Sequence, residues 1–537
     1  MNAASGEMVA GIVPILSMQT GGVAQFLLIQ AAAQAAHPAA VHNGQSYTYG
    51  DLLLRATHIA AQLRQRGIKR GDRVGVLFPN HPDYIAAFFA ATGIGAVVIP
   101  INPLLKSEEI AHILSDSNAR AVIVHERGCA EVAAACANLS DLEHVLVVLY
   151  EDQILPANLP ERIAVVALPS DKLTELGRQQ KNFAWETDID NSADLAVLVY
   201  TSGTTGKPKG AMLTHSNLLS AVDMSHKVLR ISKNDKFLVI IPMCHIYGLT
   251  VVMLGLMSKG GTLVVVEKFE PAAALKLIEQ ERVTLLPAVP SIYQFLLMEL
   301  EKNQYDLSSL RACLSGASSM PVEMFPRLMA RLPGAFVEGY GLTEVSSVVA
   351  INPVDGIQKR GSVGVPLSSV QVAIVDRQGH HLPHSSEHVG EIAVKGPNVM
   401  RGYFGKPDAT KECIRDGWFF TGDLGYRDRE GYLFIVGRTK ELIIRGGQNI
   451  YPREIEDVIM RLPEVAEVAV VGVPDQFMGE RVKAVIALRC GQSLSEERLK
   501  SFCSDNLAEY KVPRLVQFVE ALPRNSTGKV LKRLLQD

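Results

Sequence analysis

Short apolar runs alternate with amphipathic helical patterns as far as residue 315, and this alternation most restricts the folds open to the chain. Between Thr48 and Leu63 apolar residues recur every three or four positions, which predicts a helix that Gly67 ends. A buried strand at 73–78 should follow. Because strands and helices alternate, we expect a parallel α/β sheet. Further strands are predicted at 96–100, 121–124, 196–200, 237–241, 262–266, 283–288 and 310–315, and helices at 84–92 and 107–114.

The pattern changes after Gly361, where turns rich in Gly and Asp separate short apolar runs. Antiparallel strands are predicted there at 370–375, 389–395 and 432–436. A small α+β region closes the chain, with strands at 465–473 and 482–487 and a helix at 495–507. Because 537 residues are too many for one ordinary core, we expect several domains. The predicted division is a flexible N-terminal extension at 1–20, a large domain at 21–438 and a small domain at 439–537.

The composition is typical of a soluble globular enzyme, with 47% apolar and 20% charged residues. A formal net charge of −3 gives no electrostatic reason to expect nucleic acid as the main partner. Seven cysteines without any CxxC pair favour a reducing compartment over a disulfide framework. The apolar runs are too short to span a bilayer, and the N-terminus lacks a basic signal-peptide region. We therefore expect a cytoplasmic enzyme.

The most informative motif is the run Tyr-Thr-Ser-Gly-Thr-Thr-Gly-Lys-Pro-Lys-Gly at 200–210, directly after a predicted strand. Its glycines let backbone N–H groups approach phosphate oxygens, and its hydroxyl and ammonium groups add further donors. It is not a Walker A loop, because Pro208 follows Lys207 where that motif has Ser or Thr. A flexible surface loop is the alternative, but such a loop does not explain eleven residues in this particular order.

Five other segments carry small, polar or charged residues. Those at 242–248 and 315–318 lie at the ends of predicted strands, where open parallel sheets bind ligands. Glu344 is a hard oxygen ligand suited to Mg²⁺, and Thr201 could place a hydroxyl on the same ion. Taken singly, such residues could equally be a core histidine, a solvent-facing Glu or a turn Asp. The segments are Pro-Met-Cys-His-Ile-Tyr-Gly at 242–248, Ser-Gly-Ala-Ser at 315–318, Gly-Tyr-Gly-Leu-Thr-Glu at 339–344, Trp-Phe-Phe-Thr-Gly-Asp at 418–423 and Pro-Arg-Asn-Ser-Thr-Gly-Lys at 523–529.

Together these segments resemble the adenylate-forming superfamily of acyl-CoA synthetases, aryl-CoA ligases, peptide-synthetase adenylation domains and firefly luciferase. The motifs follow in family order from about Thr48 to Lys532, and segments 242–245 and 394–400 look most like bacterial long-chain fatty-acid–CoA ligases. The resemblance implies a large α/β N-terminal domain, with parallel sheets and a distorted β-barrel region, and a small α+β C-terminal domain that rotates about a hinge. It also implies ATP and CoA as co-substrates and Mg²⁺ as cofactor.

The resemblance assigns roles to residues at the matching positions. Lys529 would be the catalytic lysine of adenylation, since an ammonium can stabilise the charge that builds on phosphate oxygens. His245, Thr343 and Glu344 would be the other catalytic groups, and Thr201 and Glu344 the metal ligands. ATP or AMP would contact Thr201, Ser202, Gly203, Thr204, Thr205, Lys209, Gly316, Ala317, Glu338, Gly339, Tyr340, Thr343, Asp423, Arg438 and Lys529. The acyl group would contact His245, Tyr247, Gly316, Ala317, Gly339 and Gly341.

Two half-reactions follow from the resemblance. The acid attacks Mg·ATP to give acyl-AMP, the small domain rotates about Lys440, and the thiol of CoA then expels AMP. Gly446 and Gly447 would flank the pantetheine arm, and Lys268 is a weaker candidate for a CoA contact, because a solvated lysine is the simpler reading. Gly437 stands where many relatives have Asp, a departure that leaves Arg438 in place.

The acid is predicted to be a medium- or long-chain fatty acid, because the segment after Glu344 is neutral and the 242–248 motif lacks the Asp that binds an amino group in peptide synthetases. Aryl acids such as cinnamates are the alternative, since 242–247 also resembles 4-coumarate–CoA ligase. Loading of an acyl carrier protein, a luciferase-like oxygenase and a binding protein with an inactive site are rival readings. A monomer or homodimer, with peripheral membrane contact at most, is expected.

Overall fold

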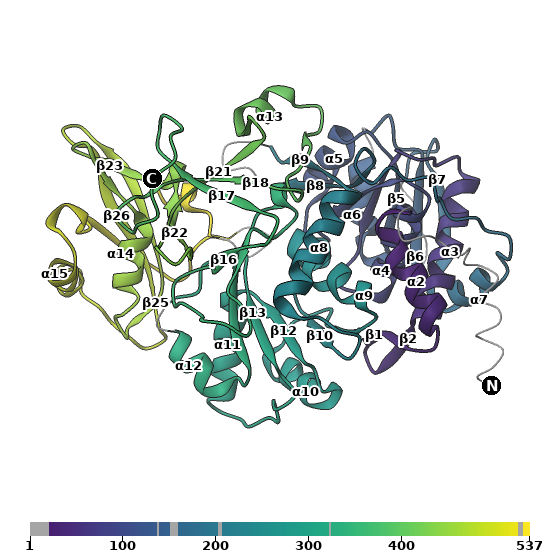
Figure 1. Cartoon of the computed structure of the whole chain (residues 1–537), viewed down its shortest axis with the longest axis horizontal. Coiled ribbons are helices and arrows are strands. Elements are labelled where there is room, and N and C mark those ends of the chain that lie inside the picture. The colour runs from purple at the N-terminus through teal and green to yellow at the C-terminus, as the bar shows by residue number, and fades with distance from the viewer. Residues whose placement is uncertain are drawn as a thin grey trace.

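Two large sheets form the N-terminal part of the molecule, and the C-terminal part lies beside them (Figure 1). The computed structural model describes residues 21–136, 139–150, 159–201, 207–321, 324–524 and 530–536. The first sheet has the order β19-β9-β8-β4-β3-β5-β6-β7. Its strands are β3 (Arg73–Leu77), β4 (Val97–Ile101), β5 (Ala119–His125), β6 (His144–Leu149), β7 (Ala164–Pro169), β8 (Leu195–Thr201), β9 (Lys209–Thr214) and β19 (Gly402–Tyr403).

The second sheet has the order β16-β15-β14-β13-β12-β10-β11-β1-β2. Its strands are β1 (Pro38–His42), β2 (Gln45–Thr48), β10 (Lys236–Val239), β11 (Thr262–Val265), β12 (Leu285–Ala288), β13 (Ala312–Ser315), β14 (Ala335–Tyr340), β15 (Ala350–Ile351) and β16 (Val365–Pro366). In both sheets the central pairs are parallel, as the alternating pattern predicted, and antiparallel strands are added at the edges.

Helices cover and separate these sheets. α3 (Tyr49–Gln65) begins at a capping box, in which the N–H of Asp51 donates to the hydroxyl of Thr48 over 3.0 Å. All residues of α4 (Pro82–Gly93) are buried, because this helix contacts β3 and β4 of one sheet and β1 of the other. The other N-terminal helices are α2 (Gln25–Gln34), α5 (Ser107–Asp116), α6 (Cys129–Cys136), α7 (Leu173–Arg178), α8 (His215–Leu229), α9 (Gly255–Lys259), α10 (Pro271–Glu281), α11 (Pro290–Leu300) and α12 (Met324–Arg331).

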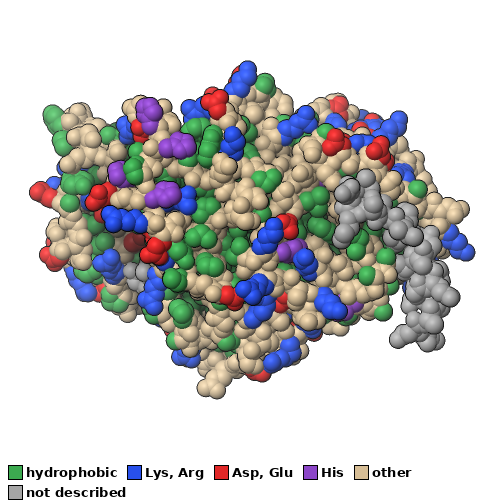
Figure 2. Space-filling view, viewed as in Figure 1, with side chains coloured by type: hydrophobic (Ala, Val, Ile, Leu, Met, Phe, Trp, Pro, Cys, Tyr) green, Lys and Arg blue, Asp and Glu red, His purple; other side chains and the backbone are tan. Residues whose placement is uncertain are grey.

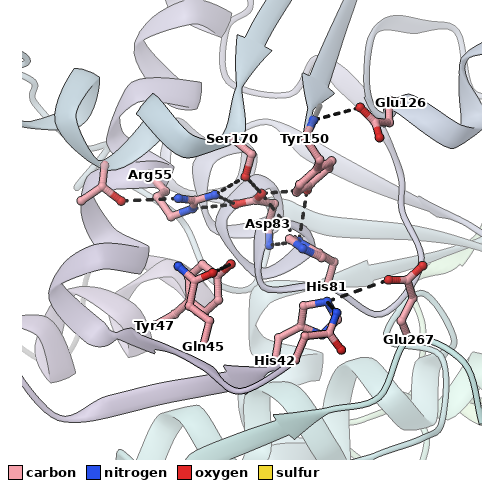
Figure 3. Close-up of polar contacts among 12 residues, drawn as sticks. His42, Gln45, Tyr47, Arg55, His81, Asp83, Glu126, Tyr150, Ser170 and Glu267 are labelled. Carbon is pink, nitrogen blue, oxygen red and sulfur yellow. Dashed lines mark hydrogen bonds and ion pairs between the residues drawn. The ribbon is translucent and has the colours of Figure 1, made fainter. Parts of the chain in front are cut away.

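A buried ion pair joins α3 to α4 (Figure 3). Nε of Arg55 lies 2.6 Å from Oδ1 of Asp83, and the hydroxyl of Tyr150 donates to the other carboxylate oxygen over 2.7 Å. Burial would raise the pKa of Asp83, but the guanidinium of Arg55 outweighs it and lowers this pKa to about 2. Since the donors of Arg55 also reach Ser170, this network is a satisfied structural connection between elements distant in sequence.

A third sheet follows in the region where antiparallel strands were predicted. It contains β17 (Gln371–Val375), β18 (Gly390–Lys395), β21 (Trp418–Arg427) and β20 (Ile414–Arg415) in that order, with β22 (Leu433–Arg438) beside β21. The fourth sheet contains β23 (Ile443–Arg445), β24 (Gln448–Ile450), β25 (Val465–Asp475), β26 (Gly479–Leu488) and β27 (Leu515–Val519). α13 (Pro407–Cys413) precedes β20, while α14 (Pro452–Ile459) and α15 (Glu496–Asn506) accompany the fourth sheet. The predicted division at 438 and 439 falls between β22 and the short turn η6 (Thr439–Glu441).

On the face shown in Figure 2, basic and acidic side chains are interspersed, without a broad area of one sign. This distribution agrees with the small net charge of −3. Among the helices that the structure describes, none is both long enough and apolar enough to cross a bilayer.

Candidate active site

The predicted phosphate-binding motif lies between two antiparallel strands. Thr201 ends β8 and Lys209 begins β9, and these two residues pair directly. The glycine-rich segment therefore connects the adjacent ends of these two strands. Ser202, Gly203, Thr204 and Thr205 fall outside the described residues, so their phosphate contacts stay predictions.

Glu344 and Lys209 are brought together by a residue that sequence reasoning missed, Tyr403. The Tyr403 hydroxyl donates to Oε1 of Glu344 over 2.8 Å. Nζ of Lys209 lies 5.2 Å from the centroid of the Tyr403 ring, within the range of a cation–π contact. No sequence pattern marked Tyr403, because it lies on the two-residue strand β19 and is far from both partners along the chain.

The residues present fit a Mg²⁺ ion held largely by nucleotide phosphates. Among the described residues, no group of three or more His, Cys, Asp or Glu side chains could hold a metal ion. Mg²⁺ at nucleotide sites commonly takes only one or two protein carboxylates and completes its shell with phosphate and water oxygens. Glu344 offers one such carboxylate. Thr201 pairs with Lys209, whose ammonium lies over the ring of Tyr403, the residue that donates to Glu344, so the Thr201 hydroxyl is on the neighbouring strand.

Asp423 is a buried carboxylate that two half-buried side chains contact. It pairs with Arg438 across β21 and β22, and Nε of Arg438 lies 3.0 Å from its Oδ1. The hydroxyl of Tyr340 donates to Oδ2 over 2.7 Å. Burial would lower the pKa of Arg438, but the carboxylates of Asp423 and Glu441 outweigh it and raise this pKa above its ordinary value. Three of the residues predicted to contact ATP or AMP are thus joined through one carboxylate.

His245 and Tyr247 form a second pair, between β10 and the π-helical segment η4 (Gly248–Leu254). The N–H of Tyr247 donates to Nδ1 of His245 over 3.3 Å, and the Tyr247 hydroxyl donates to the carbonyl of Leu314 over 3.2 Å. Burial lowers the pKa of His245, so its ring is neutral at ordinary pH. Because Nδ1 accepts a hydrogen bond, the ring proton lies on Nε2, which can therefore donate a hydrogen bond to an oxygen atom.

The glycines predicted to contact the acyl group, which would form the acyl slot, have different surroundings. A Cβ added at Gly316 would lie 3.3 Å from Cε1 of the Tyr247 ring, and one at Gly339 would lie 3.3 Å from Cγ1 of Ile351. A Cβ at Gly341 would overlap the carbonyl oxygen of Ser347, so this glycine is needed where two backbone segments approach. Ala317 is exposed and adopts a positive φ of 66°. The Gly316–Tyr247 contact therefore offers the clearest route to test the acyl slot.

Glu338 is a buried carboxyl within β14, opposite Ser315, with 2% of its surface exposed. Oε1 accepts a hydrogen bond from the N–H of Met320 over 3.1 Å, whereas Oε2 has no hydrogen-bond partner among the described residues. Burial raises the pKa of Glu338 to about 7. Arg453 and Asp457 on α14 also act on this carboxyl electrostatically, so the C-terminal part of the chain lies near it.

The structure does not bring the predicted CoA contacts together. Gly446 and Gly447 form the exposed turn between β23 and β24, with φ of 58° and 80°. Lys268 is exposed shortly after β11, whose partner β1 lies on the opposite side of the molecule from β23 (Figure 1). Lys440 lies in η6, two residues after Arg438. Lys529 falls outside the described residues, so its catalytic role stays a prediction.

Comparison with known proteins identifies the family. A family model described as AMP-binding enzyme matches residues 27–404, and one described as AMP-binding enzyme C-terminal domain matches 454–529. The long-chain-fatty-acid–CoA ligase of Bacillus subtilis (strain 168) is 38% identical over 505 residues, 92% of this chain and 90% of that protein. A feruloyl-CoA synthase of an Amycolatopsis species is also 38% identical, over 94% of this chain and 96% of its own.

Among solved structures, ATP-bound MatB from Rhodopseudomonas palustris has a TM-score of 0.85 at 32% identity, covering 96% of this chain and 98% of that chain. Its similarity extends over both parts of the molecule, so the predicted fold of a large α/β domain with a small C-terminal domain is confirmed. The chain therefore belongs to the AMP-binding enzyme family, and the predicted resemblance to adenylate-forming enzymes is confirmed.

Proposed function

We propose that this enzyme is an ATP-dependent acid–CoA ligase that activates a fatty acid as acyl-AMP and transfers the acyl group to CoA. The observation that carries the proposal is the contact of Asp423 with Tyr340 and Arg438. A carboxylate can accept hydrogen bonds from both ribose hydroxyls, while the neighbouring ring offers a face for adenine. The similarity to a long-chain-fatty-acid–CoA ligase supports a fatty acid as the substrate.

In the first half-reaction, the chain's own groups bring two anions together. Lys209 would bind phosphate oxygens, and Nε2 of His245 would donate to the carboxylate or the α-phosphate. Lys529 would stabilise the charge that builds on the phosphate as the carboxylate attacks. A bound Mg²⁺ would supply further neutralisation of phosphate charge, and Glu344 and Thr201 would hold it. Positioning and electrostatics then provide most of the acceleration.

In the second half-reaction, the small domain would turn about Lys440. Gly446 and Gly447 would then flank the pantetheine arm, where a side chain would obstruct the thiol. The thiol attacks the mixed anhydride and AMP leaves. No protein nucleophile is needed, because the attacking group is the acid in the first half-reaction and the CoA thiol in the second. Lys268 remains the weaker CoA candidate.

An aryl acid is the second candidate substrate, because a feruloyl-CoA synthase is as similar to this chain as the fatty-acid ligase. The aromatic ring of Tyr247 beside Gly316 could pack on either an alkyl or an aryl group. An acyl carrier protein is the alternative acceptor to CoA.

A release assay tests the proposal. Purified enzyme with Mg·ATP would be offered fatty acids of graded length and hydroxycinnamic acids, and pyrophosphate would be measured without acceptor. AMP release would then be measured with CoA and, separately, with an acyl carrier protein. We expect turnover with medium- or long-chain fatty acids and CoA. If no acid in the panel leads to pyrophosphate release, the proposed activity is refuted. A strong preference for the aryl acids would select the second candidate substrate.

A further inference from the structure

Glu344 is held by the segment that contains Tyr403. The N–H of Met400 donates to the carbonyl of Glu344 over 2.8 Å, and the Tyr403 hydroxyl donates to its Oε1 over 2.8 Å. Both the backbone and the side chain of this carboxylate residue are therefore fixed by one short stretch of chain. An ionised carboxylate has about four lone-pair sites, so Glu344 can accept this bond and still face a ligand.

The same segment is hydrogen-bonded to the strand that follows the phosphate-binding motif. Tyr403 pairs with Ala211 across β19 and β9, and the N–H of Phe404 donates to the carbonyl of Gly210 over 2.9 Å. These bonds bring the Tyr403 ring within 5.2 Å of Nζ of Lys209. One side chain thus contacts both the carboxylate and the ammonium that the proposed function assigns to the metal and the phosphates.

Tyr403 is itself well fixed. Its N–H donates to the hydroxyl of Thr410 on α13 over 2.9 Å, and that hydroxyl donates to the carbonyl of Lys406 over 3.0 Å. These bonds fix the backbone of Tyr403 and so limit where its hydroxyl can lie relative to Glu344.

We propose that Tyr403 is a positioning residue that orients Glu344 toward a Mg²⁺–phosphate group and keeps it in register with Lys209. The proposal rests on the proposed function. Partners that orient a metal-binding side chain commonly matter about 10- to 100-fold for metal affinity. Tyr403 would act in this way without touching the ion or the nucleotide.

Binding of α,β-methylene-ATP, which resists attack at the α-phosphate, tests this without any turnover. Its dissociation constant would be measured by calorimetry with Mn²⁺, as a stand-in for Mg²⁺, and again with EDTA; the ratio gives the factor by which the metal tightens binding. In Tyr403→Phe we expect this factor to fall about 10-fold while metal-free binding is unchanged. The matched control is Tyr305→Phe, because Tyr305 is half-buried like Tyr403 and likewise donates to a carboxylate, that of Glu299, over 2.7 Å.

A double-mutant cycle shows whether Tyr403 acts through Glu344. Glu344→Gln should lower the metal factor, and adding Tyr403→Phe to it should change the factor no further. The proposal would be overturned if Tyr403→Phe left the metal factor unchanged. It would also be overturned if Tyr403→Phe lowered the metal factor equally in the wild type and in the Glu344→Gln variant. A metal factor that Glu344→Gln leaves intact would instead remove the metal role of Glu344 from the proposed function.

If Tyr403→Phe does not fold, fluorine NMR tests the proposal on a tyrosine that keeps its hydroxyl. A fluorotyrosine placed at position 403 should give a fluorine NMR signal that broadens when Mn²⁺ and α,β-methylene-ATP bind, because the paramagnetic ion would lie beside Glu344. Fluorotyrosine at position 305 should keep its signal. A sharp signal at position 403 in the saturated complex would place the ion elsewhere and refute the proposal.

Discussion

Arg438 lies directly opposite Asp423 on neighbouring antiparallel strands, with Nε 3.0 Å from Oδ1. The Tyr340 hydroxyl occupies the other carboxylate oxygen over 2.7 Å. Asp423 is only 3% exposed, so a ribose would have to share these oxygens with partners that the protein already provides. The carboxylate is therefore oriented before any nucleotide binds, which lowers the entropy lost on binding.

Asp423→Asn should raise the KM for ATP about 10- to 100-fold, the equivalent of roughly 1.5–3 kcal/mol for a hydrogen bond to a charged group. The KM for the acid should stay within a factor of about two, since the substitution acts on the nucleotide alone. Steady-state rates with each substrate varied in turn measure both constants. Asp428→Asn is the control, because Asp428 accepts from Lys359 at the far end of the same two strands. Equal rises in both constants would point to general disruption.

The strands that carry most of the site were predictable, because buried parallel strands leave continuous apolar runs and the motifs follow them directly. The alternation also predicted α3 and α4 within a few residues. What could not be predicted was which motifs touch. The Tyr403–Glu344 bond depends on β19, which has two residues and therefore no periodicity to detect.

The sequence also could not show why a glycine is needed at a given position. Gly316 and Gly341 look alike in the sequence, yet one faces an aromatic ring and the other a backbone carbonyl. A sequence pattern records that a side chain is absent, but not what occupies the space. Similarly, nothing local to Glu338 indicated that its Oε2 would be buried without a hydrogen-bond partner in the described part of the chain, since that depends on elements brought together by the fold.

Gly316→Ala should narrow the acyl slot. The added methyl would meet the Tyr247 ring at 3.3 Å, and the hydrogen bond from Tyr247 to Leu314 limits how far the ring can move away. We expect kcat/KM for the bulkiest accepted acids to fall about 10-fold relative to short ones, the scale of overpacking by one group. The acid panel measures this change. Gly255→Ala is the control, because its methyl would meet only ordinary contacts at 3.4 and 3.7 Å. Identical preferences in all three enzymes would remove Gly316 from the slot.

Glu338→Gln should change how stability depends on pH. Burial raises the pKa of Glu338 to about 7, so the folded protein holds this proton where the unfolded chain loses it. The stability contributed by the protonated group is complete below about pH 4.5 and is lost as the pH rises through 7. Glutamine is neutral throughout and avoids this loss. The variant should therefore gain stability relative to the wild type, up to roughly 3 kcal/mol, between these pH values.

Denaturant unfolding of both proteins at a series of pH values measures this gain. A difference in the free energy of unfolding that stays constant from pH 4.5 to 8 would show that Glu338 is ionised in the folded protein, contrary to the burial argument. Nucleotide must be absent from these experiments, because a ligand that binds only the folded state adds its own stabilisation.

The two half-reactions separate the proposed roles of Lys529 and Lys440. Lys529→Ala should slow acyl-AMP formation roughly 100- to 1,000-fold, as expected for loss of a group that stabilises transition-state charge, yet still convert supplied acyl-AMP and CoA to the thioester. Lys440→Pro should do the reverse, because proline fixes φ near −65° in a segment that must change its backbone angles. Single-turnover assays of each half-reaction measure both effects.

Opposite phenotypes carry more weight than either loss alone, since general destabilisation would slow both steps together. Lys500→Ala controls for removal of a charge from the C-terminal part, because Lys500 pairs only with Glu496 one helical turn away and with the carbonyl of Arg514 among the contacts that the structure gives it. It should leave both half-reactions intact. If Lys529→Ala and Lys440→Pro remain folded and lose both half-reactions to the same extent, one arrangement of the domains must serve both steps, and the rotation about Lys440 would be excluded.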